Sequence, residues 1–338
     1  MSNLVNRQWT LANRPPEWVS ASDFKLAEAT VPDPGEGQIV IKVTHVAFEP
    51  AQRGWMAENP GYMAPIPIGG VMRSMAAGEV VASRHPDFKP GDKVSGMFGW
   101  QEYTVVDAAG QLLPVTKLAP GVTEEMALSV LGITGLTAYF GMLEVGQPKA
   151  GDVVVVSGAA GATGSIAGQI AKIKGCTVIG IAGGEDKCRW LTEVAGFDAA
   201  IDYKAEKVSR RLRELAPNGI NVFYDNVGGE ILEAALNNLA NLGRVAICGA
   251  ISGYNSGALP PPPKNYMALV WKNATMAGFL LGRFSKQFPE ATAQLAHWVK
   301  EGKLKFAVDV QEGFENVPST FLRLFQGQNL GKQLCRIA

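Results

Sequence analysis

The sequence predicts an α/β protein in which a β-rich, barrel-like unit precedes a doubly wound parallel sheet with helices on both faces. The chain has 338 residues, and at roughly 100–200 residues per domain this length favours two domains. Its first third consists of short, alternating apolar runs between Pro- and Gly-rich turns, which is typical of a small β unit. Beyond Thr123, strand-like and helix-like runs alternate, which indicates a parallel sheet covered by helices.

Four runs in the first third have the pattern of strands. In residues 38–44, Ile39, Ile41 and Val43 lie on one face and polar side chains on the other. The other runs are residues 75–83, 93–97 and 101–106, and clusters of turn-forming residues separate them. The C-terminal residues 306–338 return to short β-like pieces, so we expect this segment to pack back on the first unit.

The second part of the chain has the order expected of a doubly wound sheet. Residues 126–143 read as a helix and introduce this part. We expect strands at residues 152–157, 177–182, 199–202, 221–226, 244–249 and 275–281. We expect helices at residues 164–174, 185–194, 206–216, 230–239 and 286–302. The predicted domains are therefore residues 1–125 with 306–338, and residues 126–305.

Composition excludes several classes of partner. Lys plus Arg and Asp plus Glu both total 31, so the net charge is zero, which disfavours broad binding to nucleic acid or to an anionic membrane. Uncharged stretches at residues 126–143 and 153–171 are interrupted by Gly and hydroxyl side chains, so we expect buried elements rather than membrane spans. No apolar leader is evident near the N-terminus. Scattered cysteines predict reduced thiols and a cytoplasmic protein, namely Cys176, Cys188, Cys248 and Cys335.

A glycine-rich loop follows the first strand of the predicted parallel sheet. The run from Val153 to Ser157 leads into Gly158-Ala159-Ala160-Gly161-Ala162-Thr163-Gly164 and then into a helical pattern. The loop reads AxGxxG, with Ala159 in place of the first glycine of GxGxxG. Gly161 would allow the backbone to approach a pyrophosphate, and Gly164 would allow the helix to pack closely on the strand. The order of strand, loop and helix predicts a dinucleotide site at a helix N-terminus.

The residues after the second strand favour NADP(H) over NAD(H). In an NAD site an acidic residue follows this strand and binds the ribose 2′-hydroxyl, but here Gly183 and Gly184 follow. Lys187 stands one helical turn further on and is a candidate partner for a 2′-phosphate, although Glu185 and Asp186 are close in sequence. Tyr203, after the third strand, is a candidate second donor.

Three further segments end strands on the side where such sheets bind ligands. They are residues 224–229, 248–255 and 279–281. Asn226 and Tyr254 are the polar side chains placed where a nicotinamide ribose would lie. Cys248 has no adjacent base, so we expect a packed strand residue rather than a nucleophile.

Two classes of catalytic site lack the required residues. The histidines are His45, His85 and His297, and residues 1–125 contain no cysteine, so zinc-dependent alcohol dehydrogenase chemistry and a structural zinc lobe are not expected. We interpret His45 and His85 as structural or surface residues. No Gly-x-Ser-x-Gly elbow follows a strand, which disfavours a Ser-His-Asp hydrolase.

Across its length the chain resembles a zinc-independent group of medium-chain dehydrogenase/reductases, which includes prostaglandin reductase, leukotriene 12-hydroxydehydrogenase, plant alkenal double-bond reductase and curcumin reductase. The resemblance is carried by residues 53–56, 89–94, 99–103, 132–139, 159–164, 225–229, 248–255 and 329–332. It implies a GroES-like domain of split chain, a Rossmann domain, NADPH and a homodimer. The cofactor contacts that it implies, together with our own candidates, are Ala160, Gly161, Ala162, Thr163, Gly164, Lys187, Tyr203, Asn226, Cys248, Gly249, Ala250, Ile251, Ser252, Tyr254, Phe279, Leu280, Leu281 and Asn329.

The activity expected from this resemblance is NADPH-dependent reduction of the C=C bond of an α,β-unsaturated ketone or aldehyde, without a metal. Hydride would reach the β-carbon, and Tyr254, or a ribose hydroxyl that it positions, would stabilise the enolate oxygen. Candidate residues of an apolar substrate pocket are Trp55, Met56, Tyr62, Met72, Tyr254 and Phe284. Where the group often has a tyrosine, Glu49-Pro50 is followed by Ala51, so substrate preference is expected to differ. The alternatives are a quinone reductase and a non-catalytic NADPH-binding protein.

Overall fold

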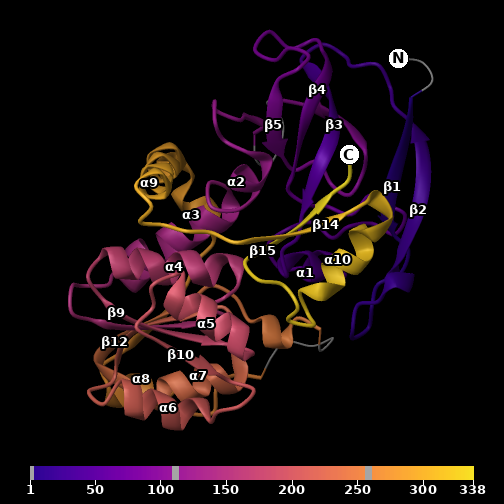
Figure 1. Ribbon diagram of the computed structural model, residues 1–338. Coiled ribbons are helices and arrows are strands. Elements are labelled where there is room, and N and C mark those ends of the chain that lie inside the picture. The colour runs from indigo at the N-terminus through magenta and orange to yellow at the C-terminus, as the bar shows by residue number, and fades with distance from the viewer. Residues whose placement is uncertain (1–3, 109–113, 256–260) are drawn as a thin grey trace. The chain divides into compact units, whose positions relative to one another are not determined.

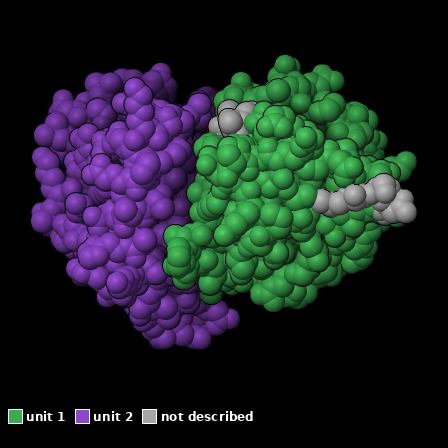
Figure 2. Space-filling view, turned by 90° about the horizontal axis from the view of Figure 1, so that it is seen from above, with its two compact units in different colours: residues 1–128, 308–338 green, residues 129–307 purple. Residues whose placement is uncertain are grey.

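The computed structural model describes residues 4–108, 114–255 and 261–338. The chain divides into two compact units, coloured in Figure 2. Unit 1 comprises Met1–Leu128 and Val308–Ala338, and unit 2 comprises Ser129–Ala307. The predicted fold class is confirmed, because the first unit is β-rich and the second is built on a parallel sheet.

Unit 1 contains a seven-stranded sheet and a two-stranded sheet (Figure 1). The larger sheet has the order β14-β15-β3-β4-β5-β7, and β6 also pairs with β3. Its strands are β3 (Gln38–Ala47), β4 (Ala76–Ser83), β5 (Lys93–Gly96), β6 (Tyr103–Asp107), β7 (Thr116–Lys117), β14 (Val308–Glu312) and β15 (Lys332–Arg336). The antiparallel pair is β1 (Val5–Leu11) and β2 (Phe24–Thr30). The unit also contains the short helices η1 (Ala21–Asp23), α1 (Ala51–Trp55) and α2 (Glu124–Leu128).

The C-terminal segment belongs to unit 1. Strand β15 pairs with β3, with Leu334 opposite Ala47, and β14 lies parallel to β15. Between them are η5 (Phe314–Asn316) and α10 (Val317–Arg323). The segment thus contains the expected short strands, and the helix between them was not predicted. Pro318 lies in the first turn of α10, where proline is tolerated, and Phe321 packs against Trp100 with ring centroids 5.3 Å apart.

Unit 2 contains six parallel strands in the order β10-β9-β8-β11-β12-β13. They are β8 (Val153–Ser157), β9 (Thr177–Ala182), β10 (Ala199–Asp202), β11 (Ile220–Asp225), β12 (Leu239–Ile247) and β13 (Thr275–Gly278). The connecting helices are α4 (Ala162–Ile173), α5 (Glu185–Glu193), α6 (Val208–Leu215) and α7 (Gly229–Leu236). Figure 1 shows α4 and α5 on one face and α6 and α7 on the other. The strand order reverses between β8 and β11, which is where doubly wound sheets bind ligands.

Several predicted boundaries differ from the structure. The single helix over residues 126–143 is wrong, because α2 ends at Leu128, α3 (Ile133–Phe140) follows a break, and a π-helix, η2 (Gly141–Gly146), follows α3. Gly132 is extended at the start of α3, and a Cβ on Gly135 would lie 1.8 Å from the Val130 carbonyl oxygen. Strand β12 begins five residues before the predicted start, at Leu239, and includes an irregularity at Leu242, whose φ is +60°.

Unit 2 also contains helix α9 and several short helices. Helix α9 (Phe288–Lys300) has Pro289 in its first turn and follows η4 (Leu281–Gln287). Two short helices, η3 (Ile251–Gly253) and α8 (Ala268–Trp271), lie between β12 and β13 in the chain. Within the described residues, no helix has the length and apolarity needed to cross a membrane.

Candidate functional site

The glycine-rich loop makes a tight turn between β8 and α4. Gly158 has a φ of +57°, and its carbonyl oxygen accepts the N–H of Gly161 at 3.0 Å. A Cβ on Gly164 would lie 2.4 Å from that oxygen, so only glycine lets α4 pack this closely on the turn. Helix α4 begins at Ala162, and Gly161, Ala162 and Thr163 are partly exposed there. This backbone fits a pyrophosphate, since a helix N-terminus offers unpaired N–H groups to an anion.

A buried carboxylate connects this loop to the end of β11. Asp225 has no exposed surface and accepts the Ser157 hydroxyl at 2.7 Å and the N–H of Val227 and of Gly228 at 3.0 Å. The Ser157 oxygen in turn accepts the N–H of Asn226 at 2.8 Å. Burial raises the pKa of Asp225, and these donors act in the opposite direction. The network fixes the carboxyl ends of β8 and β11 against each other at the reversal point of the sheet.

Asn226 is held by the same network. Its side-chain amide donates to the Ser157 carbonyl at 2.7 Å, so the residue bridges the ends of two adjacent strands. The loop after β12 is also attached here, because Ile251 N–H donates to the Asn226 carbonyl and Ser252 N–H and hydroxyl both donate to the Val227 carbonyl. Hydrogen bonds therefore join residues 225–228 and 248–252 at the carboxyl end of the sheet.

Two glycines, Gly183 and Gly184, follow β9 at the position where an NAD site carries an acidic residue. Tyr203 packs against Gly183, since a Cβ on that glycine would lie 2.8 Å from the Tyr203 ring. The Asp202 carboxylate accepts the N–H of Gly184 at 2.9 Å. Lys187 lies in the first turn of α5, which begins directly after Gly184.

The two acids that precede Lys187 are paired with another cation. Arg189 binds Glu185 at 2.6 Å and Asp186 at 3.2 Å. Arg189 therefore offsets one of these two negative charges within α5. The negative charge that would repel a 2′-phosphate bound at Lys187 is therefore reduced.

Tyr254 is fixed within the loop after β12. Its hydroxyl oxygen accepts the N–H of Ala250 at 3.2 Å, across the short helix η3. A Cβ on Gly249 would lie 3.0 Å from the same hydroxyl, so glycine leaves room for it. Cys248 lies on the sheet side of this loop, where burial raises the pKa of its thiol to about 11, which disfavours a nucleophilic thiolate.

The segment after β13 joins an aromatic cluster. Phe279 packs edge-on against Phe284 with centroids 6.5 Å apart, and Phe284 stacks on Phe140 at 4.6 Å. Phe284 is buried, whereas Leu280 is exposed and Leu281 is partly exposed. The structure thus places Phe284 among aromatic rings of unit 2 rather than on an open surface.

The other candidates lie in unit 1. Met56 and Met72 are fully buried in its core, and Trp55 is nearly so. The side chain of Trp55 donates from Nε1 to the hydroxyl of Tyr62 at 3.3 Å, and Tyr62 is exposed. Asn329 donates from its side-chain amide to the Gly331 carbonyl at 2.8 Å.

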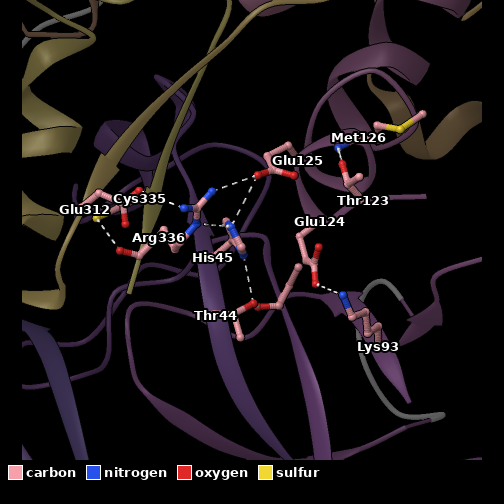
Figure 3. A network of polar contacts seen from close by, with 11 residues as sticks. Thr44, His45, Lys93, Thr123, Glu124, Glu125, Met126, Glu312, Cys335 and Arg336 are labelled. Carbon is pink, nitrogen blue, oxygen red and sulfur yellow. Dashed lines mark hydrogen bonds and ion pairs between the residues drawn. The ribbon is translucent and has the colours of Figure 1, made fainter. Parts of the chain in front are cut away.

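His45 belongs to a polar network of unit 1 (Figure 3). Its Nε2 atom accepts from Arg336 Nε at 3.2 Å, its Nδ1 lies 3.0 Å from the Thr44 hydroxyl, and Glu125 lies 3.8 Å from Nε2. Burial lowers the pKa of His45 below its usual 6.5, and Glu125 acts in the opposite direction. Within the described part of the chain, no three His, Cys, Asp or Glu side chains group in a way that could hold a metal ion.

Comparison with known proteins gives matches over the length of the chain. Residues 7–115 match a family described as the N-terminal domain of oxidoreductase, and residues 162–297 match one described as zinc-binding dehydrogenase. An NADPH-dependent curcumin reductase from Escherichia coli is 40% identical over 98% of this chain and 97% of its own. Prostaglandin reductase 1 from Oryctolagus cuniculus is 36% identical over 96% of this chain and 92% of its own. The chain belongs to the prostaglandin and curcumin reductase group of medium-chain dehydrogenase/reductases.

Further matches agree with membership of this reductase group. A 2-alkenal reductase (NADP(+)-dependent) from Nicotiana tabacum is 34% identical over 98% of each chain. The crystal structure of CurA in complex with NADPH from Vibrio vulnificus superposes with a TM-score of 0.92, at 36% identity over 98% of this chain and 99% of that one. Both parts of the fold are therefore those of the group.

The structure adds residues of this group member that sequence reasoning did not single out. Ser157 and Asp225 organise the strand ends but are 68 residues apart in the chain. In the sequence, the apolar strands β8 and β11 each end in a polar residue, and this pattern could have indicated Ser157 and Asp225. A buried ion pair in unit 1 was also missed, in which Lys332 Nζ lies 2.5 Å from Glu49 Oε1.

Proposed function

We propose that this chain is an NADPH-dependent reductase of the C=C bond of α,β-unsaturated ketones and aldehydes. The observation that carries the proposal is similarity over at least 96% of the chain to relatives named curcumin reductase, prostaglandin reductase 1 and 2-alkenal reductase. The glycine turn before α4 supports a dinucleotide, and the absence of an acidic residue directly after β9 in the sequence supports NADPH over NADH.

Each candidate then has a role in binding NADPH. The backbone of residues 160–164 binds the pyrophosphate, and Lys187 with Tyr203 binds the 2′-phosphate. Asn226, residues 248–252 and Tyr254 hold the nicotinamide ribose, and residues 279–281 and Asn329 complete the site. Residues 126–305 form the cofactor-binding domain, and residues 1–125 with 306–338 form the catalytic domain.

The reduction needs a hydride at the β-carbon and stabilisation of charge at the carbonyl oxygen. NADPH supplies the hydride when it is bound. The hydroxyl of Tyr254, held by Ala250 N–H, donates a hydrogen bond to the developing enolate oxygen or positions a ribose hydroxyl that does so. The α-carbon then takes a proton from solvent or through Tyr254.

The test is stopped-flow oxidation of NADPH with a panel of enones. We expect turnover by the wild type and a loss of about 10²-fold or more in kcat for Tyr254→Phe, the size of effect seen when one such donor is removed. Unchanged turnover in Tyr254→Phe would remove this role from the residue. Faster reduction of a naphthoquinone than of any enone would favour a quinone reductase, and NADPH binding without turnover would favour a non-catalytic protein.

We propose further that the protein is a cytoplasmic homodimer. The support for a dimer is β13, the last strand of its sheet among the described residues, whose residues are all exposed, together with exposed Val270 and Trp271 on α8, which precedes β13 in the chain. An unpaired strand edge next to apolar side chains is suited to pairing with a second copy. Sedimentation analysis of wild type and Trp271→Glu tests this, with a dimer expected for the first and a shift toward monomer for the second; a wild-type monomer would refute it.

A further inference from the structure

The residue after Tyr203 is a lysine whose charge has no partner in the part of the chain that the structure describes. Lys204 is exposed, and its ammonium group makes no hydrogen bond or ion pair with any described residue. Its backbone N–H donates to the Asp202 carboxylate at 2.9 Å, so the residue is fixed at its main chain. A lysine ammonium has three donors, and these are available to an anion.

The backbone of Lys204 is fastened to the end of β9. The Asp202 oxygen that accepts its N–H also accepts the N–H of Gly184 at 2.9 Å. In addition, the N–H of Tyr203 donates to the Ala182 carbonyl at 3.1 Å. The residues that follow β10 therefore lie directly beside those that follow β9, within unit 2.

The side chain of Lys204 lies against the first residue after β9. A Cβ placed on Gly183 would lie 2.9 Å from Lys204 Cε and 2.8 Å from the Tyr203 ring. The ammonium nitrogen is bonded to that Cε, so the charge is held where a dinucleotide-binding sheet recognises the 2′ substituent of the adenine ribose. Because Gly183 has no side chain, there is room for both Tyr203 and Lys204.

The charges at the start of α5 cancel one another. Glu185 and Asp186 contribute two negative charges, and Lys187 and Arg189 contribute two positive ones, so that 2 − 2 = 0. A phosphate monoester carries about −1.5 to −2 charges near pH 7. A 2′-phosphate bound at α5 alone would therefore meet no net positive charge, and Lys204 supplies a further cation from β10.

The acids next to Lys204 in the sequence have other partners. Glu206 pairs with Arg211 at 2.7 Å, and the Asp202 carboxylate holds two backbone N–H groups. Neither acid forms an ion pair with Lys204. We propose that Lys204 binds the 2′-phosphate of NADPH and is a residue that selects NADPH over NADH. This inference rests on the proposed function, because it assigns a further residue to the same cofactor.

Three variants separate charge from shape at this position. Lys204→Met removes the charge but keeps an unbranched apolar stem against Gly183, and Lys204→Arg keeps the charge and the donors. Lys174→Met is the matched control. Lys174 is an exposed lysine of the same unit, and it lies just before β9, at the opposite end of that strand from Gly183.

Steady-state kinetics with an enone and either cofactor measure the contribution of Lys204. We expect Lys204→Met to raise KM for NADPH by about 10-fold and to leave KM for NADH within about twofold, because only NADPH carries the 2′-phosphate. Lys204→Arg should keep KM for NADPH within about threefold of the wild type. Lys174→Met should leave both KM values within about twofold, since its charge lies away from the site.

Three results would overturn the assignment. The first is a wild-type KM for NADPH in Lys204→Met. The second is an equal rise in KM for both cofactors, because Lys204 would then act on the shape of the site and not on the phosphate. The third is an equal rise in KM for NADPH in Lys174→Met, since any loss of positive charge from unit 2 would then have the same effect.

A binding measurement distinguishes failure of this inference from failure of the proposed function. Adenosine 2′,5′-bisphosphate and adenosine 5′-monophosphate differ by the 2′-phosphate, and calorimetric titration with each needs no turnover. The wild type should bind the bisphosphate at least about 10-fold more tightly, and Lys204→Met should lose most of this preference. That result supports the role of Lys204 even if no enone is reduced. A wild-type preference that persists in Lys204→Met, or no preference in the wild type, refutes the role even if enones are reduced.

Discussion

Replacing Ser157 by alanine removes one hydroxyl from the centre of the strand-end network. This hydroxyl donates to Asp225 at 2.7 Å and accepts the N–H of Asn226 at 2.8 Å. Ser157 and Asp225 both lack exposed surface. The variant therefore loses a hydrogen bond to a buried carboxylate and leaves one N–H without its partner.

The magnitude follows from these two losses. A hydrogen bond to a charged group contributes about 1.5–3 kcal/mol, and an unsatisfied buried group costs about 1–3 kcal/mol. Because alanine leaves a small space into which the loop can relax, we expect a net loss of about 2–4 kcal/mol. For a unit of this size, that corresponds to a fall of roughly 5–15 °C in the unfolding midpoint.

Thermal unfolding of the full chain, with and without NADPH, measures the effect. Ser165→Ala is the matched control, because Ser165 is buried in α4 and its hydroxyl donates to the Ala162 carbonyl of its own helix. The control should change the midpoint by less than a quarter of the Ser157→Ala effect. The reasoning is refuted if Ser157→Ala unfolds at the wild-type temperature and binds NADPH with wild-type affinity.

Three other outcomes are expected. Gly164→Ala should raise KM for NADPH at least about 10-fold, because its Cβ would lie 2.4 Å from the Gly158 carbonyl oxygen; wild-type kinetics would contradict the tight turn. Lys187→Met should raise KM for NADPH by about 10-fold or more and leave KM for NADH within about twofold; equal effects on both would exclude a contact with the 2′-phosphate. His45 has a pKa below its usual 6.5 because of burial, so folding favours its neutral form and stability should fall as the pH drops below 6.5. His45→Gln should reduce this fall in unfolding midpoints measured between about pH 7.5 and 5.5, and an unaltered pH dependence would contradict the assignment.

Local signals made much of unit 2 predictable. The run Val153–Ser157 is apolar up to its last residue and is followed by a glycine turn and a helical pattern, all within one short segment. The starts and ends of β9 and β10 were predicted correctly for the same reason. Each of these elements is defined by neighbours in the chain.

Features that depend on distant residues could not be predicted in this way. The break before α3 is a local exception, because Gly135 closely approaches the Val130 carbonyl only five residues earlier, which a helical pattern does not reveal. Helix α10 contains Pro318, and its Phe321 packs against Trp100, far away in sequence. Ser157 with Asp225 is a similar case, since its partners come together only when the parallel strands pair. Candidate residues were thus predicted where a motif is continuous in the sequence. They were missed where strand pairing brings together residues that are far apart in the chain.

The central claim is that hydride reaches the β-carbon of an enone. The most direct measurement is NMR of the product formed from an enone and NADPH that carries deuterium at the transferred position. We predict a saturated ketone with deuterium on the β-carbon. An allylic alcohol with deuterium on the former carbonyl carbon, or no labelled product despite NADPH binding, would contradict the account.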